Sequence, residues 1–168
     1  MKKILLLSLF AIIPMLAISQ IQLKFATVRL QEIFDAMPET EEANKKLADL
    51  AQKYKEENES IKNEYENKYT DYVKSRQTMP ENIRARREQE LLTISQAIED
   101  FMMVAQNDIK QQQELLMMPI KAKLMEAVKS VGDEGGYMFV IDEAQMLYKG
   151  ANFEDITIFV KAKLDLLK

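Results

Sequence analysis

Glycine and proline are almost absent from a long central stretch of this 168-residue chain. The first glycine is Gly132, and between Pro38 and Gly132 only Pro80 and Pro119 interrupt the run. The residues between them are rich in Glu, Lys, Gln, Ala and Leu, which lose little conformational entropy in a helix. Pro80 lies near the middle, where it favours a turn and a new helix start. The sequence therefore predicts two helices, each about 60 Å long, that run out and back as a hairpin.

Each of these helices carries one narrow stripe with the 3–4 spacing of a coiled-coil seam. The first stripe consists of Leu47, Ala51, Tyr54, Asn58, Ile61, Tyr65, Tyr69 (or Lys68) and Tyr72. The second consists of Ile94, Ile98, Phe101, Ala105, Ile109, Gln112 and Leu116. Two such stripes joined by a short turn predict an antiparallel helical hairpin. Asn58 and Gln112 either set the register of the hairpin or simply face water. Pro119 should kink the second helix or divide it.

The N-terminus has the pattern of a secretory signal peptide. Lys2 and Lys3 precede a short apolar run at 4–13, and Ala17-Ile18-Ser19 offers small residues for cleavage before Gln20. The run is about half the length that a membrane span requires, which favours a signal peptide over the alternative of an N-terminal anchor. We therefore expect residues 1–19 to be removed after Ser19 and the mature chain to be exported.

We expect the two segments outside the hairpin, residues 20–38 and 132–168, to fold together into a small globular body. The expected elements are a strand at 23–29, a helix at 30–37, strands at 137–141 and 146–148, and a closing helix from about 156. A body of this size has exposed strand edges, and no disulfide supports it, so oligomerisation is the natural remedy. The expected fold class is α+β. A small sheet or barrel-like oligomerisation body carries a protruding hairpin arm at 39–131, which starts at about Thr40 and has its tip near 77–82.

Composition excludes several classes of function. Cysteine, histidine and tryptophan are absent, and from Gln20 onward 21 basic residues stand against 27 acidic ones, a net charge of −6. Thiol and imidazole chemistry are therefore excluded, and a nucleic-acid binder would need the opposite charge. The only glycine cluster, at 132–136, does not match a phosphate-binding loop. We expect no enzymatic activity, no cofactor, no metal site and no nucleic-acid partner.

The order of motifs along the mature chain resembles the Skp/OmpH-like periplasmic chaperone family. The charged arms match, together with Phe25–Val28, Ile33-Phe34, Met37-Pro38, Pro119-Ile120, Ala127-Val128, Val131, Gly136-Tyr137, Val140–Asp142, Leu147-Tyr148, Asp155–Thr157, Val160 and Leu164. The resemblance implies a homotrimer with a shared barrel-like body and three helical arms around a cavity. It also implies an ATP-independent periplasmic holdase whose clients are unfolded outer-membrane proteins. One departure is charge, because the well-known family member is strongly basic.

A holdase requires adaptable apolar contacts spread over a large surface, and methionine supplies such contacts. Nine methionines follow Gln20, with pairs at 102–103 and 117–118. At about 100° per residue, Leu92, Met103 and Met117 project away from the Phe101 stripe. The expected client-binding residues are Leu92, Met102, Met103 and Met117 on the second helix, with Tyr69 and Tyr72 near the tip. The alternative is that these side chains are scattered surface residues, or that they pack against the base.

The tip is locally basic although the chain is acidic. Lys74, Arg76, Arg84, Arg86 and Arg87 face only Glu81 between positions 74 and 87, which is a net charge of +4. These residues could make transient contact with an anionic lipid surface. A solvated helical turn explains them as well.

A second class of function is open at this stage, namely a structural coiled-coil spacer or assembly subunit of the cell envelope. The interrupted seams and the methionine pairs argue against a permanent filament, which would prefer uniform heptads. Binding of clients in solution separates the two hypotheses.

Overall fold

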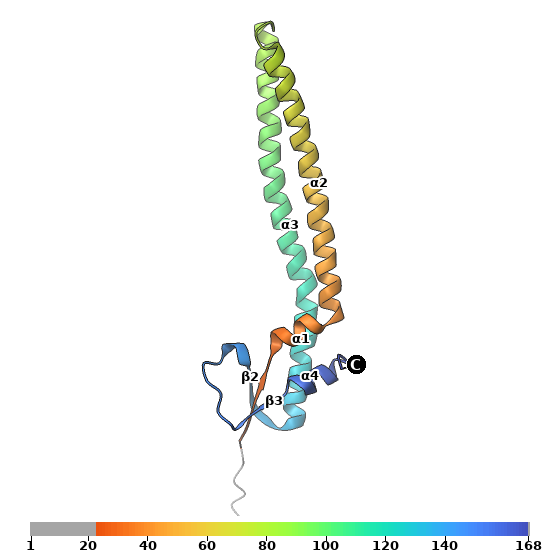
Figure 1. Cartoon of the computed structure of the whole chain (residues 1–168), viewed down its shortest axis with the longest axis vertical. Helices are drawn as coiled ribbons and strands as arrows, with labels where there is room; N and C mark the ends of the chain where they lie inside the picture. The colour runs from red at the N-terminus through yellow and green to blue at the C-terminus, as the bar shows by residue number, and fades with distance from the viewer. Residues whose placement is uncertain (1–22, 168) are drawn as a thin grey trace, which may run out of the picture.

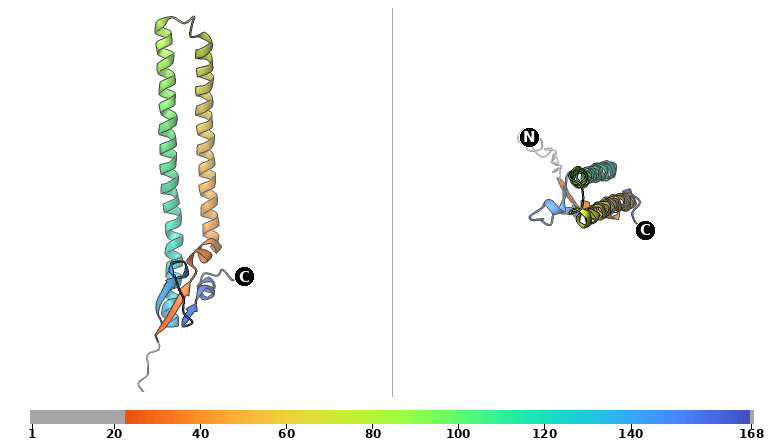
Figure 2. Two further views of the ribbon diagram at one scale, coloured as in Figure 1. Left: turned by 60° about the vertical axis from the view of Figure 1, so that its left-hand side comes forward. Right: turned by 90° about the horizontal axis from the view of Figure 1, so that it is seen from above.

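The computed structural model describes residues 23–167. A long helical hairpin projects from a small body at one end; its first helix runs beside the second, and the longer second helix continues into the body (Figures 1 and 2). Helix α2 covers Pro38–Ser75 and helix α3 covers Glu81–Gly135, with a short turn between them. The α+β fold and the protruding hairpin expected from the sequence are confirmed.

The two ends of α2 show why the hairpin starts and turns where it does. Met37 has an extended backbone (ψ 127°), and Pro38 takes the first helical position, where its missing N–H would have no partner in any case. The helix therefore begins two residues before the expected Thr40. At the tip, the carbonyl of Pro80 accepts hydrogen bonds from the N–H groups of Ile83 and Arg84, each at 3.0 Å. Pro80 thus caps the start of α3.

Helix α3 is continuous through Pro119, so of the two outcomes expected at that proline a division of the helix is ruled out, and a kink stays a prediction. Ile120 and Leu124, on its C-terminal side, are 6% and 4% exposed and hold this part of the helix against the body. The helix also passes Gly132 and ends at Gly135. Gly136 ends it in the left-handed conformation (φ 64°), which glycine adopts without a steric cost.

The body contains a three-stranded parallel sheet with the order β2-β1-β3. Strand β1 covers Lys24–Val28, β2 covers Tyr137–Asp142 and β3 covers Phe153–Asp155. The sequence predicted the first two strands. The prediction of a further strand at 146–148 is wrong, because this segment is not a strand in the structure. The third strand instead follows a short 3₁₀ helix, η1 (Glu143–Gln145), and a loop. The segment at 146–148 finds no partner strand within the described chain, whereas 153–155 lies beside β1.

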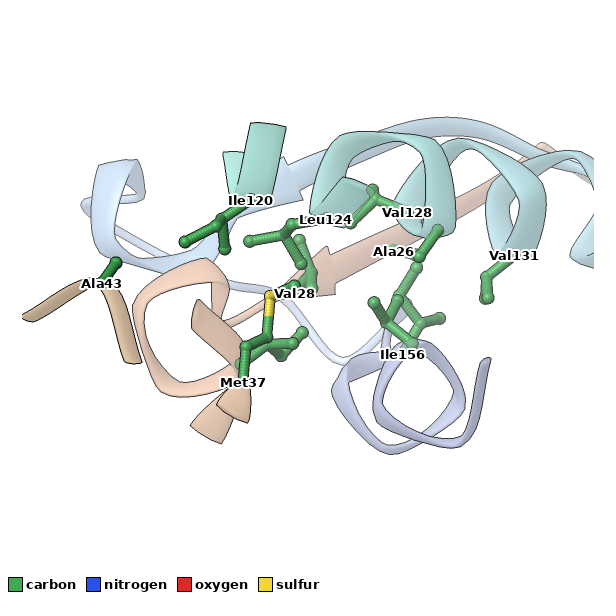
Figure 3. Packing of buried hydrophobic residues seen from close by; sticks show 12 residues of the cluster. Ala26, Val28, Met37, Ala43, Ile120, Leu124, Val128, Val131 and Ile156 are labelled. Atoms are coloured by element: carbon green, nitrogen blue, oxygen red, sulfur yellow. The ribbon is translucent and has the colours of Figure 1, made fainter. Parts of the chain in front are cut away.

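The hydrophobic core lies where the sheet, the short helices and the root of the hairpin meet. Helix α1 (Leu30–Ala36) precedes α2, and helix α4 (Thr157–Lys163) closes the described chain. Ala26, Ile33, Ile156 and Val160 are fully buried. Figure 3 shows side chains from α3, β1 and α4 converging on this cluster. The arm is therefore anchored in the body by the last turns of α3.

The hairpin seam follows the expected stripes with one difference, which is that Ala51 is exposed. Of the two alternatives at the position near the tip, Lys68 rather than Tyr69 takes the seam. On α3, the whole expected stripe from Ile94 to Leu116 is buried or half-buried. Tyr54 packs edge-on against Phe101 across the seam, with ring centroids 5.8 Å apart.

Candidate functional site

The outer face of α3 carries a line of exposed apolar side chains. Leu92, Met103, Met118 and Met125 are 51%, 58%, 64% and 54% exposed. They are separated by about three, four and two helical turns, so they share one face, on the side of the helix away from the Phe101 stripe. We call this line the α3 apolar face. It extends for about 50 Å from the root of the hairpin toward the tip.

The residues expected to contact clients on α3 have different surroundings. Leu92 and Met103 lie on the α3 apolar face, and Met102 beside them is 43% exposed. Met117 is half-buried and packs against the core cluster of the body. The structure therefore brings Leu92, Met102 and Met103 together on an accessible surface and places most of Met117 at the junction with the base.

The two tyrosines near the tip also differ. Tyr69 is 49% exposed and stacks on Tyr65, with ring centroids 6.0 Å apart. Tyr72 is 8% exposed, and its hydroxyl donates a hydrogen bond to Glu88 of α3. This hydrogen bond raises the pKa of Tyr72. The accessible aromatic surface at this level therefore comes from Tyr69, while Tyr72 belongs to the seam.

Sequence reasoning did not single out Met118 and Met125, although both are more than half exposed. The helical rotation that selected Leu92 and Met103 could have found them, because all four residues lie on one side of α3. Of the pair 117–118, helical rotation selected Met117, whereas the structure leaves Met118 the more exposed of the two. Met118 faces outward, and Met117 faces the base.

A cleft of about 780 Å³ opens at the root of the hairpin. Apolar side chains from α1 and α3 line much of it, and the hydroxyl of Thr40, a residue only 3% exposed, has no hydrogen-bond partner among the described residues. The lining residues are Leu30, Gln31, Phe34, Asp35, Thr40, Asn44, Gln113, Met117, Lys121, Leu124, Met125, Asp142 and Ala144. Met125 thus joins the α3 apolar face to this cleft.

Polar contacts tie the two helices together in the outer part of the arm. Lys68 of α2 forms an ion pair with Glu90 of α3, and Arg87 lies 3.0 Å from the same carboxylate. The hydrogen bonds from Lys68 and Arg87 lower the pKa of Glu90. Further toward the base, the hydroxyl of Tyr54 donates a 2.8 Å hydrogen bond to Asp108. These contacts close the hairpin while leaving its outer surfaces open.

At the tip, several of the basic residues are already engaged. Arg84 forms an ion pair with Glu81, and the guanidinium of Arg76 lies 6.0 Å from the centre of the Tyr72 ring. Lys74 and Arg86 are exposed. Arg76 keeps its positive charge, since an aromatic ring does not neutralise it, so the charge at the tip that no ion pair among the described residues offsets is carried by Lys74, Arg76 and Arg86.

The body displays a separate apolar surface on the loop before β3. Leu147 and Tyr148 are 105% and 83% exposed. The next residue, Lys149, anchors the loop: its ammonium lies 3.1 Å from Glu143 and 3.2 Å from the hydroxyl of Thr27. The contacts of Lys149 therefore fix the loop in a position that leaves Leu147 and Tyr148 exposed to solvent. Exposed apolar side chains of this size are typical of a surface that another chain covers.

Within residues 23–167 the structure contains no group of three or more acidic, His or Cys side chains that could hold a metal ion. None of the helices in the same range combines the length and the apolar composition that a bilayer span requires. The predicted signal peptide lies outside the described residues.

Comparison with known proteins identifies the family. Residues 24–164 match the family described as outer membrane protein (OmpH-like), and the chain belongs to this family. The chaperone protein Skp of Pectobacterium atrosepticum is 27% identical over 134 residues, which cover 80% of this chain and 81% of that protein. A crystal structure of a candidate outer membrane chaperone (OmpH-like) from Caulobacter crescentus superposes with a TM-score of 0.72 at 16% identity. The superposition covers 85% of this chain and 84% of the Caulobacter crescentus chain.

Proposed function

We propose that this protein is an ATP-independent holdase that binds unfolded outer-membrane proteins in the periplasm and prevents their aggregation. The single observation that carries the proposal is the α3 apolar face, a methionine-rich surface about 50 Å long on an arm anchored in a stable body. Methionine side chains adapt to many partners, as a client without a fixed shape requires. Membership of the OmpH-like family and similarity to a chaperone support the same conclusion.

Weak contacts become effective when several arms act together. Each buried apolar side chain contributes on the order of 1 kcal/mol, so one arm alone holds a client loosely. Arms joined through one body raise the effective concentration of the remaining contacts, and each contact stays reversible without nucleotide. Clients would leave when folding into the membrane is more favourable than staying bound. We therefore propose a homotrimer in which three arms surround a cavity.

The body offers support for self-association. Among residues 23–167, strand β2 pairs only with β1, which leaves its other edge open in this part of the chain, and Met138 and Phe139 on this strand are more than half exposed. The segment 146–148 has strand-forming residues but no strand partner within the described chain, and it carries the exposed Leu147 and Tyr148. The open edge of β2 in one copy can therefore pair with the segment 146–148 of another copy.

The oligomer is tested by measuring the mass of residues 20–168 with light scattering after size exclusion. We expect the mass of three chains. Leu147→Asp together with Tyr148→Asp should lower it toward one chain, because charges would replace the apolar contact. Leu92→Asp, on the arm, is the matched control and should leave the mass unchanged. An unchanged mass in the double variant would show that this loop is not the interface.

The holdase is tested by diluting a urea-unfolded outer-membrane barrel into buffer without ATP and following turbidity. Residues 20–168 should suppress aggregation, with saturation near three chains per client. Absence of suppression at any excess would reject the holdase and leave the structural spacer of the envelope as the better account.

The client-binding residues are tested by replacing Leu92, Met102 and Met103 with Ser. We expect an unchanged oligomer and weaker protection, because these side chains are exposed and support no core packing. Val104→Ser with Leu115→Ser is the matched control, since both side chains are equally exposed but lie toward the flank of α3. Met117→Ser should affect the stability of the base as well, and Tyr69→Ser should weaken protection near the tip. Full protection by the triple variant would reject the α3 apolar face as the client surface.

A further inference from the structure

Methionine carries all the sulfur of this protein, because the sequence has no cysteine. The nine methionines that follow Gln20 all lie in the described part of the chain, and their exposure varies widely. Met37 is 1% exposed and belongs to the core of the body. Four others are grouped on α3: Met102, Met103, Met118 and Met125 are 43%, 58%, 64% and 54% exposed.

We propose that these four α3 methionines form an oxidation site that switches client binding off. A peroxide supplies the oxidant. The thioether sulfur attacks one peroxide oxygen, the O–O bond breaks, and the sulfur gains an oxygen while the peroxide is reduced to water. The sulfur loses two electrons and becomes a sulfoxide. The effect on clients rests on the proposed holdase function.

The position of the site determines what oxidation changes. Each sulfoxide replaces a flexible apolar group with a polar one, at the residues that offer adaptable apolar contact to a client. The four side chains lie outside the core cluster, so the helix and the body keep their packing after the reaction. Met37 is protected by burial as long as the body stays folded. The protein can therefore lose client affinity without losing its fold.

The reaction is reversible in principle, since methionine sulfoxide reductases restore the thioether, with one enzyme for each sulfoxide epimer. This reversibility distinguishes a switch from damage. Because the sulfoxides form on an exposed helical surface, a reductase can reach them without unfolding the protein.

The experiment treats residues 20–168 with dilute hydrogen peroxide and locates the sulfoxides by peptide mass spectrometry. We expect the exposed methionines, namely Met102, Met103, Met118 and Met125 on α3 and Met138 on β2, to react before the half-buried ones, and Met37 to react last. The helical circular dichroism and the oligomer mass should stay unchanged. The concentration needed to protect an unfolded outer-membrane barrel should rise roughly tenfold, because several apolar contacts are weakened together. Treatment with both sulfoxide reductases should restore the original value.

Two variants make the test specific. Replacing the four α3 methionines with Leu removes the oxidisable sulfur and keeps an apolar side chain. Whatever concentration of this variant is needed to protect clients, it should be the same before and after peroxide. The matched control replaces Met79, in the turn at the tip, with Leu and should remain as sensitive as the natural sequence. Peroxide sensitivity in the α3 variant, or full protection by the oxidised natural protein, would overturn the proposal.

The two proposals fail in distinguishable ways. A lack of protection by the untreated protein would reject the holdase, while the order of oxidation would still test the site by mass spectrometry. If Met37 or the half-buried Met117 reacted as fast as the α3 group, the site would be rejected whatever the client assay showed.

Discussion

The body and the outer arm of this protein are stabilised in different ways. In the body and at the root of the hairpin, twelve apolar side chains form one cluster, each at most 7% exposed. In the outer arm, which we define as residues 58–105, the buried apolar side chains are Tyr72, Leu91 and Ala105. Much of the remaining contact between α2 and α3 in the outer arm is polar, as in Lys68–Glu90 and Tyr72–Glu88.

This difference separates the part of the molecule that anchors the arm from the part that carries much of the proposed client surface. Apolar burial gives the body a large and cooperative share of the stability, whereas a narrow seam with exposed polar contacts opens at a lower free energy. Leu92 and Met103, the part of the α3 apolar face that lies in the outer arm, are carried by this less stable region, which suits the proposed binding of clients of many shapes. Four predictions test the comparison, beginning with the largest expected effect.

The first prediction compares the same substitution in the two regions. Ile33→Ala in the body should lower the free energy of unfolding by about 2–5 kcal/mol, because Ile33 is fully buried and a cavity would remain. Ile83→Ala, at a residue that is 40% exposed near the tip, should change it by less than about 0.5 kcal/mol. Urea titration followed by circular dichroism, at one fixed protein concentration, measures both values. Equal effects would show that the body is not the stable region.

The second prediction concerns two neighbouring leucines of the outer arm. Leu91 is 8% exposed in the seam and Leu92 is 51% exposed on the outer face. Leu91→Ala should destabilise the outer arm by roughly 2–3 kcal/mol, while Leu92→Ala should have little effect. Hydrogen exchange should show faster exchange across residues 58–105 for Leu91→Ala only, with strand β1 still protected. Equal loss of protection in β1 would mean that arm and body unfold as one unit.

The third prediction strengthens the outer arm. Asn58 lies in the seam, and its buried side-chain oxygen has no hydrogen-bond partner among the described residues. It borders an apolar recess of about 230 Å³ that Phe101 and Ala105 also line. Asn58→Leu should stabilise the outer arm by about 1 kcal/mol, because it removes an unsatisfied polar group and fills apolar space.

Slower hydrogen exchange in the outer arm would confirm this gain. Asn63→Leu, at an exposed position of α2, is the matched control and should leave exchange unchanged. A loss of stability in Asn58→Leu would overturn the prediction.

The fourth and smallest prediction concerns pH. The pKa of Glu90 is lowered in the folded protein, chiefly by its hydrogen bond with Lys68, so its contribution is present above the ordinary value of 4.5 and is lost as pH falls through the lower folded value. Acidification from pH 7 to about 3 should therefore weaken the outer arm. Glu90→Gln should reduce this pH dependence in hydrogen exchange, whereas Glu66→Gln, on the exposed side of α2, should not. If Glu90→Gln showed the same pH dependence as the natural sequence, the Lys68–Glu90 ion pair would not be its cause.

Much of the arm could be predicted from local patterns. The scarcity of Gly and Pro and the 3–4 spacing of Tyr54, Tyr65, Phe101 and Ala105 predict a hairpin with one seam, because helix formation and helix faces depend on residues near one another in the chain. The same spacing could not decide whether Lys68 or Tyr69 enters the seam. That choice depends on Glu90 of the facing helix, which pairs with Lys68.

The candidate site was partly predictable for the same reason. Helical rotation placed Leu92 and Met103 on the outer face, and their exposure agrees with it. Rotation alone could not show that Met117 packs against the base while Met118 faces outward, since this depends on where the body meets the helix. The role of these residues in holding clients stays a prediction.

The sequence was sufficient for the hairpin, for strands β1 and β2 and for the apolar stripes, because these follow from short-range periodicity and propensity. Only the tertiary structure decided that α3 continues through Pro119, that Phe153–Asp155 rather than 146–148 becomes the third strand, and which methionines remain exposed. Each of these outcomes depends on a partner that is distant in the chain. Ile120 packs into the body, β1 offers an edge to β3, and the core buries Met37.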